Sequence, residues 1–360
     1  MTAPVAAPPR DPALPQLALL TDRDALGTFL ARLPWLDGAD LRDTAFRLRW
    51  KPGTNARVGA VAPGPAGPVG VLVATFAAGA ERKAARIAAA ARERDLPAFC
   101  ADGLVVVPDR ADPDLGERLP DARPLAYNPA RRWVGRVGDQ VVKIYADPPP
   151  TGMAALHAAP PRALARFLPA TSVFVGSRCV RTAWVDGHPP APVDVVAIGA
   201  ALRTLHATPP PAGLPVLDAP AALVAAERAA HSVALTLPAL RSRLTSLIGI
   251  LRRASWPAPR VLVHGDLSPD QIVIAAGAAV LLDLDRAAVG PPGWDEAQWT
   301  VAQLATGGPV LPPLGAAPPV LVLAAALQRA AEPFRRLRVD WVQRTEAVLA
   351  AADAAAEELT

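Results

Sequence analysis

The sequence has little cysteine, because Cys100 and Cys179 are the only two in 360 residues. Two cysteines cannot build the disulfide framework of a small secreted domain, and these two lack the short spacing of metal-binding pairs. This usage is typical of a reducing compartment, so we expect a cytoplasmic protein.

Long uninterrupted hydrophobic runs are also missing. The first twenty residues have no basic start, and prolines break them before a hydrophobic segment forms, so they do not resemble a secretory signal. The longest uncharged stretch, residues 302–328, carries prolines at positions 309, 312, 313, 318 and 319. Prolines at this density interrupt a membrane-spanning helix. The sequence therefore predicts no membrane partner.

Blocks of like charge are absent as well. No run of five or more Lys and Arg residues occurs, and the net charge of +4 is small for this length. Nucleic-acid-binding proteins usually concentrate basic residues into a patch or tail. We therefore expect no nucleic-acid partner, and a basic site for an anionic nucleotide is a sufficient use of the charge.

What the chain does have is alanine, proline and arginine in abundance, with 51% hydrophobic residues overall. Turn signals alternate with periodic apolar runs, so the bias does not indicate disorder. A chain of 360 residues exceeds one ordinary core, and two or three domains are expected.

Chemistry-bearing residues concentrate between residues 261 and 285. The run VLVHGDLSPDQIVI is followed closely by LLDLD, and its apolar parts predict short strands at 261–263, 272–274 and 280–282. Asp266 and Asp283 therefore end up beside neighbouring strands. Phosphoryl transfer uses one carboxylate at the attacking hydroxyl and another at the Mg²⁺ that bridges the phosphates of ATP.

The spacing inside this run supports the same chemistry. In the protein-kinase catalytic loop the Asp lies five residues before a metal-binding Asn, and Gln271 lies five residues after Asp266. The alternative is that His-Gly-Asp is a chance turn after a strand. The spacing, the flanking strands and the second acidic motif agree with each other and favour the catalytic interpretation.

HGDLSPDQIVI followed by LLDLDRAAVGPPGWD resembles the kinase-like small-molecule phosphotransferases, which include aminoglycoside phosphotransferases and choline kinases. The resemblance implies an α+β, two-lobed protein-kinase-like fold with a β-rich amino-terminal lobe and a mostly helical carboxyl-terminal lobe. It also implies ATP and Mg²⁺ as cofactors. Gln271 stands where most members have Asn and resembles the maltose-kinase branch.

The resemblance assigns roles to five residues. Asp266 would be the general base, or at least the acceptor that orients the substrate hydroxyl, and His264 would brace the loop through hydrogen bonds. Gln271 and Asp283 would hold Mg²⁺, with Asp285 in support. Gln271 has a longer side chain than Asn but still carries an oxygen that can bind Mg²⁺.

Two residues outside this run are expected to support it. His206 ends a predicted amphipathic helix at 193–207 and is expected to be a buried, hydrogen-bonded structural histidine. Asp295, in the segment RAAVGPPGWDEAQW, has the place of a family acid that caps or braces the catalytic loop.

Upstream, the sequence resembles a kinase amino-terminal lobe. Strands are expected at 125–127, 133–137 and 140–145, and Lys143 lies on the third, where kinases keep the lysine that contacts the α- and β-phosphates. A lone lysine on an apolar strand could instead extend its ammonium group to solvent.

Two further nucleotide contacts are expected. The loop at 128–132 has no glycine, so Arg131 and Arg132 would supply charge in place of backbone donors. The segment RTAWVDG would be the hinge, where adenine would bond to the backbone at Ala183 and Val185. Trp184 would be a flanking wall or a core side chain.

The expected domains are an α/β region at 1–118, the amino-terminal lobe and hinge at 119–187, and a helical lobe at 188–360. RLRWKPGTNARVGAV at 47–61 echoes RPLAYNPARRWVGRV at 123–137. The amino-terminal region is therefore a candidate degenerate copy of the lobe. Two unrelated hairpins would also produce this echo.

Two hypotheses for the function remain. The first is an ATP- and Mg²⁺-dependent phosphotransferase acting on a hydroxyl of an antibiotic such as an aminoglycoside, a sugar or an amino alcohol. The second is a non-catalytic nucleotide-binding pseudokinase, since the helix expected near 151–159 lacks the usual glutamate and the loop at 128–132 lacks glycine. The sequence specifies neither the acceptor nor the oligomeric state.

Overall fold

A computed structural model of the protein describes residues 9–36, 39, 41, 44–65, 67–170, 173–175, 177–308 and 310–360. The chain forms two compact units. The first contains the described residues of 1–148, 175–181 and 334–339, and the second contains those of 149–174, 182–333 and 340–360. Among the described residues, no helix combines the length and the apolar composition that a membrane span requires.

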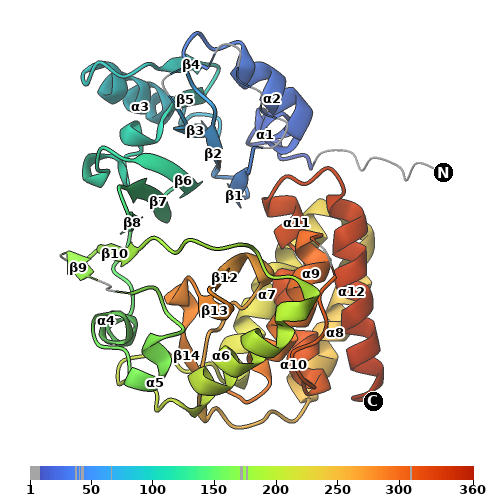
Figure 1. The fold of residues 1–360 in the computed structure, drawn as a ribbon. Coiled ribbons are helices and arrows are strands. Elements are labelled where there is room, and N and C mark those ends of the chain that lie inside the picture. The colour runs from blue at the N-terminus through green and yellow to red at the C-terminus, as the bar shows by residue number, and fades with distance from the viewer. Residues whose placement is uncertain are drawn as a thin grey trace. The chain divides into compact units, whose positions relative to one another are not determined.

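Two five-stranded sheets form most of the first unit (Figure 1), and only residues 173–174 and 182–183 of the second sheet are counted in the second unit. One sheet has the order β1-β2-β3-β5-β4 and is built from β1 (Arg47–Lys51), β2 (Asn55–Ala62), β3 (Val69–Phe76), β4 (Phe99–Ala101) and β5 (Leu104–Pro108). The other has the order β6-β7-β8-β10-β9 and is built from β6 (Arg123–Asn128), β7 (Arg132–Val137), β8 (Gln140–Tyr145), β9 (Val173–Val175) and β10 (Cys179–Ala183).

The two sheets have the same strand order. In each sheet the first three strands lie side by side in chain order, and the fifth strand lies between the third and the fourth. Helix α3 (Arg82–Arg92) lies between β3 and β4 in the sequence, and α4 (Thr151–Ala158) and α5 (Arg162–Ala165) lie between β8 and β9. A duplication would produce this similarity, and the duplication stays a prediction. The strands β4 and β5 were not expected from the sequence.

Alternation along β8 sets the faces of the second sheet. Val142 and Ile144 are buried in the core that the two sheets share, together with Tyr127, Trp133 and residues of the first sheet such as Leu72. Lys143, between Val142 and Ile144, points to the opposite face. The first unit also contains α1 (Leu17–Thr21) and α2 (Arg23–Ala31).

The second unit is mostly helical. Its helices are α4, α5, α6 (Val195–Ala207), α7 (Ala219–Thr236), α8 (Arg241–Arg253), α9 (Trp294–Thr306), α10 (Pro319–Arg329), the start of α11 (Glu332–Arg335) and α12 (Trp341–Glu357). Helix α10 packs against α7, α9 and α12 (Figure 1). Its sequence is apolar on every side until its last two residues, which is typical of a buried central helix.

Two short antiparallel pairs carry the loops of the candidate site. Strand β11 (Val261–Val263) pairs with β14 (Ala288–Gly290), and β12 (Ile272–Ala275) pairs with β13 (Ala278–Leu281). The two-residue turn between β12 and β13 has positive φ at Ala276 and Gly277, as tight hairpins require. Strand β14 was not expected from the sequence.

The α+β class expected from the sequence is confirmed, with sheets in the first unit and helices dominating the second.

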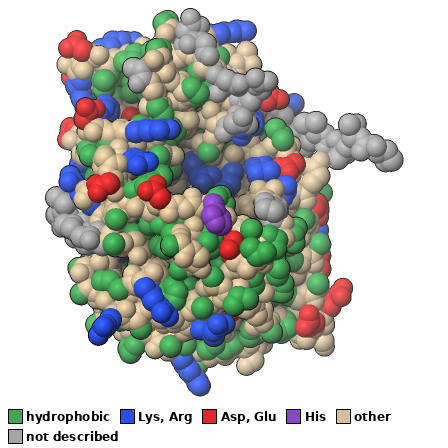
Figure 2. All heavy atoms as spheres, viewed as in Figure 1, with side chains coloured by type: hydrophobic (Ala, Val, Ile, Leu, Met, Phe, Trp, Pro, Cys, Tyr) green, Lys and Arg blue, Asp and Glu red, His purple; other side chains and the backbone are tan. Residues whose placement is uncertain are grey.

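On the face drawn in Figure 2, acidic and basic side chains are interspersed with hydrophobic ones.

Candidate active site

Strand β11 delivers His264, Gly265 and Asp266 to the turn that follows it. Gly265 has a φ of 82°, and a Cβ at this position would overlap the carbonyl oxygen of Arg286. Only glycine fits both restrictions. His264 is fully buried, and its Nε2 lies 2.7 Å from the carbonyl oxygen of Leu282. A carbonyl only accepts, so Nε2 carries the proton and ties the turn to the residue before Asp283.

Asp295, near the start of α9, holds the same turn from the other side. Its carboxylate accepts hydrogen bonds from the backbone N–H of His264 at 2.8 Å and of Gly265 at 2.9 Å. The Nε2 of His206, on α6, donates to it at 3.0 Å. Asp295 is fully buried and has three donors, so its charge is compensated. This confirms the bracing position expected of Asp295 and the hydrogen bond expected of His206, although the His206 side chain is partly rather than fully buried.

The His206–Asp295 pair predicts a pH dependence of stability. Burial on its own lowers the pKa of His206, but the hydrogen bond and charge of Asp295 outweigh it, and the pKa is raised above 6.5. The folded state therefore holds the proton more tightly than the unfolded chain does. The stabilisation is complete below pH 6.5 and is lost as the pH rises through the raised pKa.

We expect His206→Gln to remove this part of the pH dependence, because an amide can still donate to Asp295 but does not titrate. Urea unfolding across pH values from about 6 to 9 measures it. The matched control is His231→Gln, which replaces an exposed histidine on α7. Identical pH profiles for the wild type and the His206 variant would contradict the assignment.

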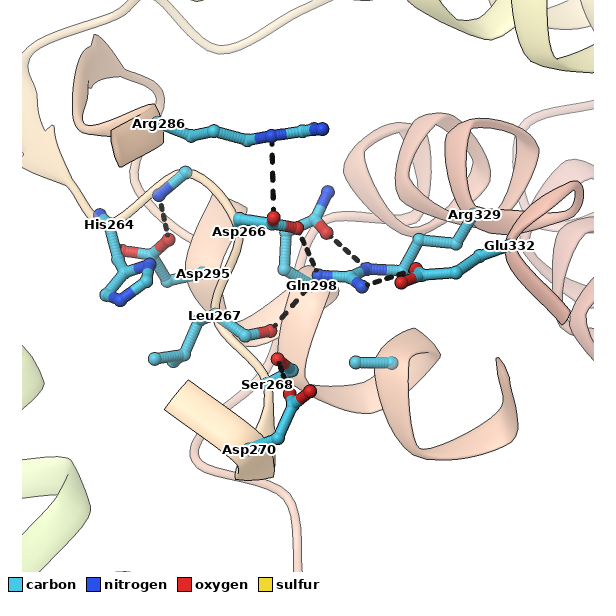
Figure 3. Close-up of polar contacts among 12 residues, drawn as sticks. His264, Asp266, Leu267, Ser268, Asp270, Arg286, Asp295, Gln298, Arg329 and Glu332 are labelled. Carbon is cyan, nitrogen blue, oxygen red and sulfur yellow. Dashed lines mark hydrogen bonds and ion pairs between the residues drawn. The ribbon is translucent and has the colours of Figure 1, made fainter. Parts of the chain in front are cut away.

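The carboxylate of Asp266 is contacted by two arginines (Figure 3). Its Oδ1 accepts from Nη2 of Arg329 at 2.8 Å, and its Oδ2 lies 3.4 Å from Nε of Arg286. The Asp266 side chain is nevertheless 31% exposed. A carboxylate has about four lone-pair sites, so two contacts leave room for a hydroxyl donor. Asp266 is thus fixed in orientation and still reachable.

Arg329, the last residue of α10, is only 5% exposed and is held on several sides. Its Nε donates to Oε1 of Gln298 at 2.6 Å, and its Nη1 donates to Glu332 at 3.0 Å (Figure 3). A buried guanidinium group needs such acceptors to offset its lost hydration. Because the arginine is fixed, the carboxylate that it binds is fixed as well.

The sequence interpretation did not identify Arg329 and Gln298. The sequence did contain one signal for Arg329, which is a charged residue at the end of an otherwise apolar helix. A charged residue in a buried helix needs a polar partner nearby. The identity of that partner could not be read from the sequence, because Asp266 lies 63 positions away.

The two proposed metal ligands are neighbours in the structure. The N–H of Leu282 donates to the carbonyl oxygen of Gln271 at 2.8 Å, which places Gln271 beside the start of the Asp283 turn. Asp283 has φ 59° and ψ 52°, a left-handed conformation that is strained for a residue with a Cβ and that clusters at functional sites. Asp285 follows within the turn 284–286.

These residues fit the chemistry of Mg²⁺. An amide oxygen and carboxylate oxygens are hard ligands, as this cation prefers. Within the described part of the chain, no three His, Cys, Asp or Glu side chains gather into a complete metal cage. Mg²⁺ usually takes only one or two protein ligands together with phosphate oxygens and water, so a complete cage is not required.

Lys143 lies in the first unit, in the middle of β8 and opposite Val134 on β7. It is only 9% exposed, so its side chain does not extend freely into solvent as the alternative interpretation required. A buried lysine needs acceptors for its ammonium group. The phosphate role of Lys143 stays a prediction.

The turn before Arg131 and Arg132 is held by residues from the amino-terminal region of the same unit. Arg49 donates to the carbonyl oxygens of Pro129 at 2.9 Å and Ala130 at 2.8 Å. The N–H of Ala130 donates to the carboxylate of Asp112 at 3.2 Å. One backbone donor of this turn is thus already used. A phosphate contact here would fall to Arg131, which is exposed, and Arg132, which is half-buried.

The expected hinge lies in the second unit at the end of β10. The N–H of Ala183 donates to the carbonyl oxygen of Ala170 at 3.1 Å, so a nucleotide contact at Ala183 falls to its carbonyl oxygen. Val185 follows, and Nε1 of Trp184 donates to Asp186 at 2.8 Å. Trp184 is half-buried rather than a core side chain.

The structure therefore gathers part of the expected site. The second unit contains the catalytic and metal candidates and the hinge: His264, Asp266, Gln271, Asp283, Asp285, Ala183 and Val185. The first unit contains the phosphate-contacting candidates: Lys143, Arg131 and Arg132. The roles assigned to these residues stay predictions.

Comparison with known families gives a match over the candidate site. A family model described as the phosphotransferase enzyme family matches residues 120–303, just over half of the chain. The match includes β6 to β8, the turn after β11 and most of α9. A comparison with curated protein sequences found no match.

Several solved structures are similar. A choline/ethanolamine kinase family protein from Mesorhizobium loti has 18% identity and a TM-score of 0.46, over 67% of this chain and 89% of that chain. Choline kinase from Cryptosporidium parvum has 10% identity and a TM-score of 0.48, over 69% and 94%. A thermostable mutant of aminoglycoside phosphotransferase APH(4)-Ia, in a complex with AMP-PNP and hygromycin B, has 14% identity and a TM-score of 0.46, over 69% and 98%.

Proposed function

The chain belongs to the phosphotransferase enzyme family, and we propose that it moves the γ-phosphate of ATP to a hydroxyl group of a small molecule. The observation that carries the proposal is the setting of Asp266. A buried arginine orients its carboxylate, and Asp295 holds the turn that carries it. The Asp266 side chain is nevertheless 31% exposed. A carboxylate held in this way can accept the proton of an incoming hydroxyl group.

The chemical step follows from this geometry. The acceptor hydroxyl donates a hydrogen bond to Asp266. This hydrogen bond orients the hydroxyl oxygen toward the γ-phosphorus. A new P–O bond forms as the bond between the γ-phosphorus and the β–γ bridging oxygen breaks, and ADP leaves. The hydroxyl proton passes to Asp266 or to the transferred phosphate. The transition state is loose, so orientation and charge stabilisation contribute more than strong basicity.

Gln271 and Asp283 are the proposed holders of Mg²⁺, with Asp285 in support. The ion would neutralise charge on the β- and γ-phosphates. The hydrogen bond from His264 to the carbonyl oxygen of Leu282 connects the residue before Asp283 to the turn that carries Asp266. Lys143, Arg131 and Arg132 are the proposed phosphate contacts, and Ala183 and Val185 the proposed adenine contacts.

The proposed acceptors are aminoglycosides and other antibiotics, sugars and amino alcohols. The test is a screen of the purified full-length protein with Mg-ATP against a panel of these compounds. ADP release is measured, and products are identified by mass spectrometry. Phosphorylation of one panel member would support the proposal and name the acceptor class. ATP binding without transfer to any member would favour the nucleotide-binding pseudokinase instead.

A prediction about the metal can be tested without an acceptor. Mg-ATP at a hundred times its Kd should stabilise the folded protein by ~2.7 kcal/mol. We expect Asp283→Asn to remove most of this shift, because the neutral amide binds Mg²⁺ less tightly. Thermal unfolding with ATP in Mg²⁺ and in EDTA measures it, with Asp218→Asn at the start of α7 as the control. Equal shifts in Mg²⁺ and EDTA for all proteins would argue against the assignment.

A further inference from the structure

A cavity of about 390 Å³ in the first unit has no role in the proposed reaction. It lies where the segment leading into the second sheet passes β8 and β10. Three arginines line it, Arg118 from that segment and Arg178 and Arg181 from the β10 region, and Val142 and Ile144 of β8 provide an apolar wall. Cavities of this size are typical of small-molecule sites.

The charges around this cavity are not compensated within the described part of the chain. Arg118 donates to the backbone carbonyl of Asp114 at 2.8 Å, and Arg178 donates to the backbone carbonyl of Ala146. The Nε of Arg181 is buried and has no hydrogen-bond acceptor among the described residues. None of the three guanidinium groups forms an ion pair with a carboxylate there.

This arrangement differs from that of the buried arginine at the active site. Arg329 is surrounded by acceptors that offset its charge, whereas the arginines of the cavity lack carboxylate partners. A concave site lined by one sign of charge attracts counter-ions. Guanidinium groups match the planar geometry of carboxylate and phosphate oxygens and bind them with two hydrogen bonds.

We propose that this cavity binds a small organic anion that carries a phosphate or carboxylate group. The anionic group would be bound by Arg118, Arg178 and Arg181. The rest of the ligand would pack against the apolar lining of the cavity, where the partly exposed Pro120 and Cys179 lie beside the buried Val142 and Ile144. Val142 and Ile144 point to the opposite face of β8 from Lys143, and no residue that lines the cavity is assigned a part in the proposed reaction. The proposal therefore does not depend on that reaction.

The test uses the full-length protein and isothermal titration with three probes: phenyl phosphate, benzoate and inorganic phosphate, each against sodium chloride of matched ionic strength. We expect wild-type protein to bind phenyl phosphate or benzoate, and phenyl phosphate more tightly than inorganic phosphate because the ring covers the apolar wall. The preferred probe then distinguishes a phosphate ligand from a carboxylate ligand.

The decisive variants are Arg181→Gln and Arg118→Gln. Each variant removes one charge-assisted contact and should raise the Kd for the probe about 10- to 100-fold. Arg118 is exposed, so its replacement tests the site even if Arg181→Gln fails to fold. Arg203→Gln, an exposed arginine on α6, is the matched control and should bind as the wild type does. Lys143→Ala reports binding at the nucleotide phosphates.

Three results would overturn the proposal. The first is that no probe binds the wild type beyond the chloride control. The second is that both cavity variants bind the probes as tightly as Arg203→Gln does. The third is that only Lys143→Ala loses binding, which would place the anion at the nucleotide site.

Discussion

Asp266→Asn is expected to lower turnover with the acceptor found in the screen by ~10²–10⁴-fold, the typical effect of removing a positioned general base. The affinity for Mg-ATP should hardly change, because the proposed role of Asp266 concerns the acceptor hydroxyl. The physical reason is that an amide cannot take up a proton and accepts a weaker hydrogen bond from the hydroxyl. Steady-state rates and ATP titration together measure the two effects.

Asparagine is a better replacement than alanine at this position. Its oxygen can still accept from Nη2 of Arg329, whereas alanine would remove that acceptor from a guanidinium group that is only 5% exposed. Leaving this buried donor unsatisfied costs about 1–3 kcal/mol, even though Glu332 and Gln298 still accept from Arg329, and would confuse loss of stability with loss of catalysis. The Asn variant should therefore melt close to the wild type.

The matched control is Glu227→Gln, which removes the acid of an exposed ion pair with Arg252 in the same unit. Exposed pairs contribute little to stability, so activity and melting should stay near those of the wild type. An Asp266→Asn protein with wild-type turnover would rule out the mechanism proposed here. Loss of ATP binding together with turnover would instead place Asp266 at the nucleotide.

The local parts of the candidate site could be predicted from the sequence. Apolar runs of three or four residues that stop at His264 and Asp283 produced strands close to their expected ranges. The place of Asp295 in a segment typical of the family indicated a brace, and its carboxylate accepts from two backbone N–H groups of the catalytic turn. The strands follow from short apolar runs and turn residues, whereas the brace was predicted only from the resemblance, because Asp295 lies 31 positions from His264.

The long-range parts could not be predicted. Arg329 reaches Asp266 from the end of a helix, and a single side-chain pair leaves no periodic pattern in the sequence. Strands β4 and β14 have three residues each, too short for alternation to be recognised, and form because longer or buried strands pair with them. The contact of Asp112 with the turn at Ala130 likewise depends on how the two sheets pack.

The packing between the two sheets determines how the amino-terminal region contributes to the fold. Nε1 of Trp133 donates to the carboxylate of Asp109 at 2.6 Å, and the hydroxyl of Tyr127 donates to Asp112 at 2.5 Å. Burial raises the pKa of Asp109, although the hydrogen bond from Trp133 partly offsets this. Trp133 and Tyr127 are at most 2% exposed. Tyr127 and Trp133 of the second sheet thus each have a buried acceptor from residues before 118.

Removal of residues 1–121, leaving a chain that starts at Ala122, is therefore expected to prevent stable folding of the first unit. Tyr127, Trp133, Val142 and Ile144 would lose the core that they share with the first sheet. Burial of one large apolar side chain contributes about 1.5–3 kcal/mol, so the four together amount to roughly 6–12 kcal/mol. This is comparable to the whole stability of a domain, about 5–15 kcal/mol.

The truncated protein should be insoluble or should show no cooperative melting of the first unit. Because a truncation can fail for other reasons, Leu72→Ala on β3 provides a second measurement in the full chain. Leu72 is fully buried in the shared core, and its truncation should cost about 2–5 kcal/mol. If the two sheets form one cooperative unit, this change also lowers the melting temperature of the second sheet. The melting of the second sheet is measured by the fluorescence of Trp133 in a protein whose other tryptophans are replaced by phenylalanine. An unshifted Trp133 transition in Leu72→Ala, or a truncated protein that melts and binds ATP as the full chain does, would show that the amino-terminal region is an independent module.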